Sequence, residues 1–219
     1  MSSVNSNICA TCEQALPHLT DVCQLCALPF YSAYSPICGP CLLNPPPWQR
    51  LDSLCEYVAP VDSLIHAFKY HADFTSVTPL TRGLAARVTA HRQRWPDAMI
   101  PVPLHQWRHW RRGFNQALEI TRQLHQILHI PLRTDLCRRI KNTVTQTGLE
   151  HSRRKANMRN AFVAHAECAG QHLAVVDDVL TTGATLRALC GELNAAGAAT
   201  LEVWTCARVV RLGAPAGFR

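Results

Sequence analysis

Apolar residues along the chain follow two different spacings. In some segments they recur every three or four positions, which is typical of a helix with one buried face. In others they form short unbroken runs, which are typical of a buried strand. Because the two types alternate, the sequence predicts an α/β fold, a mostly parallel sheet with helices on both faces. Helices are predicted at residues 61–68, 80–88, 114–128 and 186–196, and strands at 99–104, 173–176 and 200–206.

Cysteines dominate the segment before this alternation. Three Cys-x-x-Cys pairs follow one another, and two such pairs supply the four thiolates of a structural zinc site. The second and third pairs are the preferred ligands because both read as tight knuckles, and the first and second pairs are the alternative set. The pairs are Cys9 and Cys12, Cys23 and Cys26, and Cys38 and Cys41.

The cysteine segment and the alternating segment predict two domains. Residues 1–50 would form a small zinc-finger domain whose missing folding energy comes from the metal. Residues 51–219 would form the sheet domain, and the run Pro45-Pro46-Pro47-Trp48 between them would act as a stiff connector.

Composition limits the class of protein. Hydrophobic residues make up 47% of the 219 residues and charged residues only 17%, which is typical of a globular chain and not of a disordered one. The amino terminus shows no basic region followed by an apolar run, and no apolar run approaches the length of a membrane helix. We expect a cytoplasmic protein that does not insert into a membrane.

Positive charge is concentrated in the middle of the chain. Residues 105–159 hold twelve Lys or Arg and three acidic residues, a net charge of +9, which leaves −2 for the rest of the total of +7. Such a block can attract the phosphates of a small ligand or of nucleic acid. A set of solubilising surface arginines is the other interpretation.

The strongest chemical signal is the run Leu173 to Thr185, in which an apolar strand is followed by two acids and a Thr/Gly loop. In open α/β sheets ligands bind at the carboxyl ends of strands. There the acids would meet ribose-like hydroxyls or a metal, and the loop and helix N-terminus would hold a phosphate. An ordinary strand-to-helix turn capped by threonine is the alternative. The candidate residues are Asp177, Asp178, Thr181, Thr182, Gly183, Ala184 and Thr185.

Two further segments are candidates for the same site. The loop after residue 103 is rich in donors and would lie beside the acids, where its backbone amides and guanidinium groups suit pyrophosphate. The basic segment 138–162 would be a mobile cover or DNA contact, or else a plain surface hairpin. The loop candidates are Leu104, His105, Arg112 and Gly113, and those of the basic segment are Lys141, Arg153, Arg154 and Arg159.

The run Leu173 to Thr185 resembles the phosphoribosyl-pyrophosphate (PRPP) motif of type I phosphoribosyltransferases. With the other motifs, the chain resembles the ComF/GntX family of competence-associated, phosphoribosyltransferase-like proteins almost from end to end. Longer members of that family carry four cysteine pairs. The resemblance rests on the cysteine pairs, Phe68-Lys69-Tyr70, Pro101 to His105, Arg112-Gly113-Phe114-Asn115-Gln116, Thr145 to Asn157, Asp177 to Thr185, and Trp204 to Arg208.

The resemblance implies a zinc finger fused to a type I phosphoribosyltransferase fold. It also implies a PRPP-binding protein, with magnesium carried by PRPP, that acts in natural transformation. There it would handle single-stranded DNA entering the cytosol beside a helicase-like translocase. The acceptor and the occurrence of turnover stay open, since no general base stands out and no catalytic residue is assigned. The alternative is a non-catalytic adaptor that binds DNA and a partner and uses the phosphate site for binding only.

Overall fold

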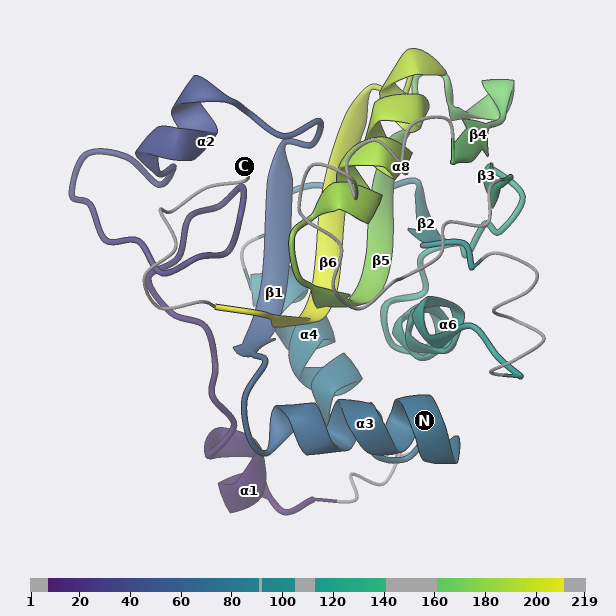
Figure 1. The fold of residues 1–219 in the computed structure, drawn as a ribbon. Helices are drawn as coiled ribbons and strands as arrows, with labels where there is room; N and C mark the ends of the chain where they lie inside the picture. Colours follow the sequence, from purple (N-terminus) through teal and green to yellow (C-terminus); the bar gives the residue numbers. More distant parts are fainter. Residues whose placement is uncertain (1–7, 91, 105–112, 141–160, 211–219) are drawn as a thin grey trace, which may run out of the picture.

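A four-stranded parallel sheet forms the centre of the molecule, in the order β1-β6-β5-β2 (Figure 1). The computed structural model describes residues 8–90, 92–104, 113–140 and 161–210. The strands are β1 (Arg50–Glu56), β2 (Ala98–Pro101), β5 (His172–Leu180) and β6 (Thr200–Arg208). Their carboxyl ends share one edge of the sheet, because all pairings are parallel.

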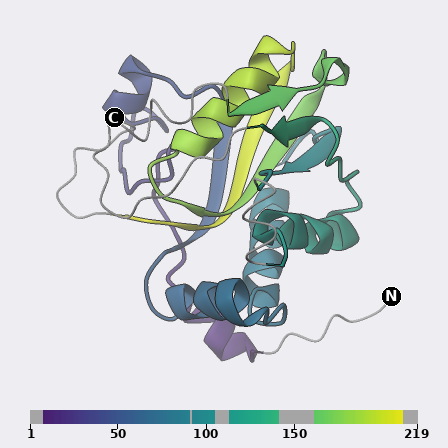
Figure 2. The ribbon, with the colours of Figure 1, turned by 45° about the vertical axis from the view of Figure 1, so that its right-hand side comes forward.

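Helices cover both faces of the sheet, as Figure 2 shows. Side chains alternate along β5, so that Leu173 and Val175 pack on one face while Ala174 and Val176 pack on the other. Helix α8 (Ala184–Ala195) covers the first face, and α3 (Val61–His71), α4 (Thr78–Ala90) and α6 (Gln116–Leu128) cover the second. The predicted fold class is confirmed.

Several boundaries differ from those predicted. Strand β1 was not predicted, because Asp52 and Ser53 interrupt its apolar run, yet both are buried. Asp52 is tolerated because the Arg50 guanidinium binds it through two hydrogen bonds of 2.9 and 3.1 Å. Strand β5 continues through both acids to Leu180, and β2 ends at Pro101, before the predicted end.

The amino-terminal segment is folded against the sheet. It contains the short helices α1 (Ala10–Gln14) and α2 (Gly39–Leu43), and its second and third cysteine pairs pack with α8 in one hydrophobic core. Trp48 of the proline-rich connector is buried, and its indole N–H donates to the carbonyl of Leu25 over 2.9 Å. The division of the chain at residue 50 stays a prediction, and the segments before and after it share a core.

A second, antiparallel pair of strands flanks the basic segment. Strands β3 (Cys137–Arg139) and β4 (Phe162–Ala164) pair directly, and a short 3-10 helix, η1 (Ala166–Cys168), follows β4. The four basic residues predicted as a cover, Lys141, Arg153, Arg154 and Arg159, lie outside the described residues. Within the described part of the chain, no helix combines the length and the apolar character needed to cross a membrane.

Candidate functional site

The two acids lie at the carboxyl end of β5, one of the two inner strands of the sheet. Asp178 forms an ion pair with Lys69 of α3, with 2.7 Å between Nζ and Oδ2, and both side chains are largely withdrawn from solvent. Asp177 lies beside Thr205 of β6 in register. The sheet therefore presents the acid pair at the edge where its strands end, and a lysine from a covering helix neutralises one member.

The two carboxyl groups have different electrostatic surroundings. Desolvation raises the pKa of Asp177 to about 8, and the negative charge of Asp178 adds to this rise. Burial works against the charged form of Lys69, but attraction to Asp178 is stronger overall and raises the pKa of the amine. The cluster thus combines an ion pair with a carboxyl whose protonated form is favoured by desolvation, which suits hydrogen bonding to hydroxyl groups.

The Thr/Gly loop turns directly from β5 into α8. Gly183 adopts a left-handed conformation at φ 75°, which is favourable for glycine and strained for other residues. It occupies the N-cap position, so no side chain caps the helix there, and the first turn of α8 contains no acid. The Thr182 hydroxyl lies 3.5 Å from the amide of Ala184. The N-terminus of this twelve-residue helix can therefore accept a phosphate.

The described part of the Arg-Gly-Phe-Asn-Gln motif, from Gly113 onward, anchors the end of the loop that follows β2. Asn115 caps α6 by accepting from the amide of Leu118, and its side-chain amide donates to the carbonyl of Val102 over 3.1 Å. The ring of Phe114 lies 5.4 Å from that of Phe68 and 5.0 Å from that of Phe74. This aromatic cluster joins the start of α6 to the helix that carries Lys69.

Of the predicted pyrophosphate residues, only two are described. Leu104 is partly exposed after β2, and Gly113 is exposed with a left-handed φ of 78°. His105 and Arg112 lie outside the described residues. The pyrophosphate assignment stays a prediction.

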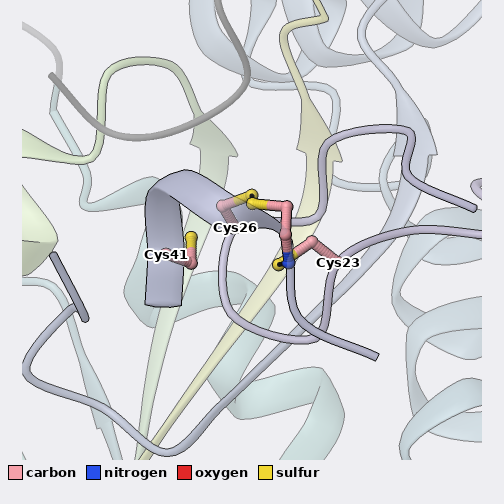
Figure 3. Close-up of side chains that lie close together, drawn as sticks. Cys23, Cys26 and Cys41 are labelled. Carbon is pink, nitrogen blue, oxygen red and sulfur yellow. Dashed lines mark hydrogen bonds between the residues drawn. The ribbon is translucent and has the colours of Figure 1, made fainter. Parts of the chain in front are cut away.

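Four cysteines form a compact cluster beside the sheet, and Figure 3 labels three of them, Cys23, Cys26 and Cys41. The sulfur atoms of Cys23, Cys26, Cys38 and Cys41 all lie within 4.8 Å of one another, and all four residues are buried. The Cys26 and Cys38 sulfurs are 3.8 Å apart. Zinc with four sulfurs at about 2.3 Å would place neighbouring sulfurs about 3.8 Å apart in a tetrahedron. The donor set and its spacing therefore fit structural zinc.

Backbone groups orient this cluster. The amides of Leu25 and Cys38 point to the Cys23 sulfur at 3.5 and 3.3 Å. These contacts lower the negative charge on a thiolate that binds metal. The cluster consists of the second and third cysteine pairs, which was the preferred set.

Cys9 and Cys12 lie elsewhere. Both are exposed at α1, where the Cys9 sulfur caps the helix by accepting from the Cys12 amide at 3.5 Å. The structure does not bring them to the buried cluster, so the alternative set of the first and second pairs is not assembled. His18 contacts the carbonyl of Glu13 at 3.1 Å and also lies away from the cluster.

Sequence reasoning missed two basic residues that complete this region. Lys69 was part of the quoted Phe68-Lys69-Tyr70 motif, yet its pairing with Asp178 could not be read from the motif. Arg208 ends β6 and is buried; its Nε donates to the carbonyl of Cys26 over 3.0 Å, and its NH1 to that of Leu180 over 3.1 Å. Burial lowers the pKa of Arg208 to about 10, which leaves it charged at neutral pH. The sequence signal was its place at the end of the closing strand.

Comparison with known proteins gives close relatives along nearly the whole chain. The chain is 38% identical over 207 residues to DNA utilization protein YhgH of Shigella flexneri, covering 93% of this chain and 91% of that protein. It is 35% identical over 212 residues to Competence protein F of Haemophilus influenzae, with the same two coverages. This chain belongs to the ComF/GntX family. No family model matches it.

Solved structures resemble this ComF/GntX protein only in part. A purine phosphoribosyltransferase from Pyrococcus horikoshii is 21% identical, with a TM-score of 0.37, over 58% of this chain and 68% of its own. The glutamine PRPP amidotransferase from B. subtilis is 16% identical, with a TM-score of 0.39, over 59% of this chain and 26% of its own.

Proposed function

We propose that this protein binds PRPP at the carboxyl edge of its sheet and acts in the handling of single-stranded DNA. The observation that carries the proposal is the acid pair at the end of β5, followed at once by the uncapped N-terminus of α8. A sugar phosphate matches that arrangement, because it carries hydroxyl groups and a phosphate a short distance apart.

Each half of the site has a distinct role in this proposal. Asp177 and Asp178 hold the ribose hydroxyls, and the protonated state of Asp177 lets it donate as well as accept. The residues from Thr181 to Thr185 hold the 5′-phosphate through backbone amides and hydroxyls. The pyrophosphate faces the loop after β2, where Leu104 and Gly113 mark the two described ends.

Magnesium would enter with the ligand. Mg²⁺ commonly retains water and substrate oxygens as ligands, and the pyrophosphate of PRPP supplies such oxygens. Because Lys69 already neutralises Asp178, the acid pair is better suited to hydroxyl groups than to direct coordination of a free cation. When bound, the metal would neutralise charge on the pyrophosphate.

Any transfer step would break the bond between the ribose C1 carbon and a pyrophosphate oxygen. The electron pair leaves with pyrophosphate, and an acceptor then bonds to the electron-poor carbon. The contribution of this chain would be to position the sugar and the leaving pyrophosphate. The acceptor is left open, and the proposal requires binding and not turnover.

The role in DNA handling comes from the relatives and from charge. Two relatives carry the names DNA utilization protein and Competence protein F. The net charge of +9 in residues 105–159 suits contact with a phosphate backbone. We propose a cytoplasmic protein that meets incoming single-stranded DNA together with a helicase-like translocase.

Calorimetry with PRPP and Mg²⁺ tests the ligand assignment. We expect measurable binding by the zinc-loaded protein and its loss in Asp177→Asn/Asp178→Asn. Asp135→Asn is the matched control, because Asp135 is an exposed acid paired with Arg133 and remote from β5 in sequence. Absence of binding by the folded wild type would overturn the PRPP assignment.

A non-catalytic DNA adaptor is the second candidate. The observation that favours it is the net charge of +9 in residues 105–159, which would attract a phosphate backbone whether or not the acid pair binds a sugar. Fluorescence anisotropy with a single-stranded oligonucleotide at several salt concentrations tests it. We expect affinity to fall with salt and to be lost in Arg153→Glu/Arg154→Glu. DNA binding without PRPP binding would select the adaptor.

A further inference from the structure

We propose that Arg208 couples the four-cysteine centre to the phosphate loop, so that metal binding and phosphate binding strengthen each other. The identity of the phosphate ligand rests on the proposed function, whereas the coupling itself rests on contacts between described residues. Arg208 would act as a positioning residue, since it binds backbone carbonyls at the start of the loop.

The first connection is a set of hydrogen bonds from one buried side chain. Arg208 Nε donates to the carbonyl of Cys26, a member of the metal-type cluster, over 3.0 Å. Its NH1 donates to the carbonyl of Leu180 over 3.1 Å and also to that of Thr181. One planar, rigid guanidinium group thus binds a cysteine knuckle and the start of the phosphate loop at the same time.

The second connection runs from the same knuckle to the helix after the loop. Trp48 donates to the carbonyl of Leu25, which lies between two cluster cysteines, over 2.9 Å. The guanidinium of Arg187, in the first turn of α8, lies 5.8 Å from the centre of the Trp48 ring. The knuckle therefore supports the loop from both of its ends.

Charge adds to these contacts. Four thiolates bound to zinc carry a net charge of −2, and the two arginines nearest the knuckle contacts carry +2. Loss of the metal would remove both the fixed position of the Cys26 carbonyl and the attraction between these charges.

A reciprocal effect follows. If the metal holds the loop in its binding conformation, the metal raises the affinity of the loop for its ligand. The bound ligand must then raise the affinity of the cluster for the metal by the same factor. Typical coupling between two sites in proteins is about 5- to 150-fold in affinity. We expect a value toward the lower end, because two side chains carry the connection.

Arg208→Lys is the test variant. Lysine keeps the positive charge, but its single ammonium group cannot reach the carbonyl of Cys26 and the carbonyl of Leu180 at once as the planar guanidinium does. Arg92→Lys is the matched control: Arg92 is also largely buried, and it binds Glu202 and packs on Trp204. Zinc content, the rate of zinc transfer to a chelating dye and amide hydrogen exchange of residues 181–186 are measured on zinc-loaded proteins. PRPP affinity is measured alongside.

We expect Arg208→Lys to release zinc at least 5-fold faster than wild type and to exchange the loop amides faster, while Arg92→Lys changes neither. In wild type, PRPP should slow zinc release, and Arg208→Lys should lose that effect. Unchanged zinc release and loop exchange in a folded, zinc-loaded Arg208→Lys protein would overturn the coupling.

Failure of the proposed function gives a different result. If the wild type binds no PRPP, the ligand assignment fails, and zinc release together with amide exchange still decides the coupling. If the wild type binds PRPP and Arg208→Lys binds it equally well with unaltered zinc release, the ligand assignment holds and the coupling fails.

Discussion

Acidic residues lie at both ends of the central sheet, and their surroundings shift the pKa in opposite directions. We call the end where the strands begin the amino edge and the end where they finish the carboxyl edge. At the amino edge, Glu202 is buried but fully engaged: Arg92 donates to it at 3.0 and 2.7 Å, Trp204 donates at 3.0 Å, and His172 lies at 2.7 Å. Although burial opposes ionisation, these partners lower the pKa of Glu202. At the carboxyl edge, desolvation raises the pKa of Asp177.

The difference separates a structural network from a candidate site. A buried acid whose charge is balanced by hydrogen-bonded partners helps to specify the fold. An acid whose ionised form is desolvated without such partners lowers the stability of the folded state. Perturbed carboxyl groups of the second kind concentrate at functional sites. The acid pair therefore has the character of a binding site, and the amino-edge network that of a support.

The largest change in stability should come from removing the buried carboxylate of Glu202 at the amino edge. Glu202→Ala leaves the buried Arg92 with only the more distant carboxylate of Asp52, 3.8 Å away, and we expect a loss of about 3–5 kcal/mol in the free energy of unfolding. Urea denaturation measures it, with Glu167→Ala as the control at an exposed ion pair. A loss below 1 kcal/mol would contradict the supporting role of this edge.

Removing Lys69 should have the next largest effect. In Lys69→Met, Asp178 loses its partner beside Asp177, and we expect a loss on the order of 2 kcal/mol at pH 8. The loss should shrink toward pH 5, where protonation relieves the repulsion between the two acids. Denaturation at both pH values measures this, and a loss that does not depend on pH would mean that Lys69 acts through packing alone.

Asp177→Asn should instead stabilise the protein. The folded pKa of Asp177, about 8, lies above the ordinary value of 3.8 that it has in the unfolded chain, so the folded wild type binds more protons than the unfolded chain between these pH values. Wild-type stability should therefore fall as pH rises from 4 to 8. The full shift would correspond to about 5 kcal/mol at pH 8. Because the Asp177 residue is only partly buried, solvent screens this effect, and we expect the variant to gain on the order of 2 kcal/mol at pH 8 and almost nothing at pH 4.

Thermal unfolding across this pH range measures the gain. Asp135→Asn is again the control, because its carboxyl is exposed and its pKa is lowered by Arg133. A stabilisation of equal size at every pH would mean that the ionisation of Asp177 is not its cause.

The smallest effect is expected away from both edges. Arg133 binds Asp135 and Glu167 on the surface at 2.7 and 2.6 Å. Exposed ion pairs contribute about 0–1 kcal/mol, so Arg133→Ala should lower stability by no more than that, and less in high salt. Denaturation at two salt concentrations measures it. A larger loss would contradict the expectation that exposed ion pairs contribute much less to stability than the amino-edge network.

Much of the architecture was predictable, because it depends on short-range pattern. The apolar runs identified β5 and β6, and the helical spacing identified α3, α4, α6 and α8 within a few residues of their ends. Strand β1 escaped, since the partner that makes a buried Asp52 acceptable is a contact and not a pattern. In the loop after β2, the sequence indicated the hydrogen-bond donors. The aromatic cluster around Phe114 became visible only in the structure.

By itself, the sequence determined that thiols come in close pairs and that two acids precede a phosphate-type loop. Both are local features, in which neighbours along the chain are necessarily neighbours in space. Only the tertiary structure decided which cysteine pairs meet, that Lys69 pairs with Asp178, and that Arg208 reaches the carbonyl of Cys26, 182 positions away in sequence. Such contacts depend on how the covering helices and the cysteine segment pack on the sheet, because packing and not spacing brings distant residues together.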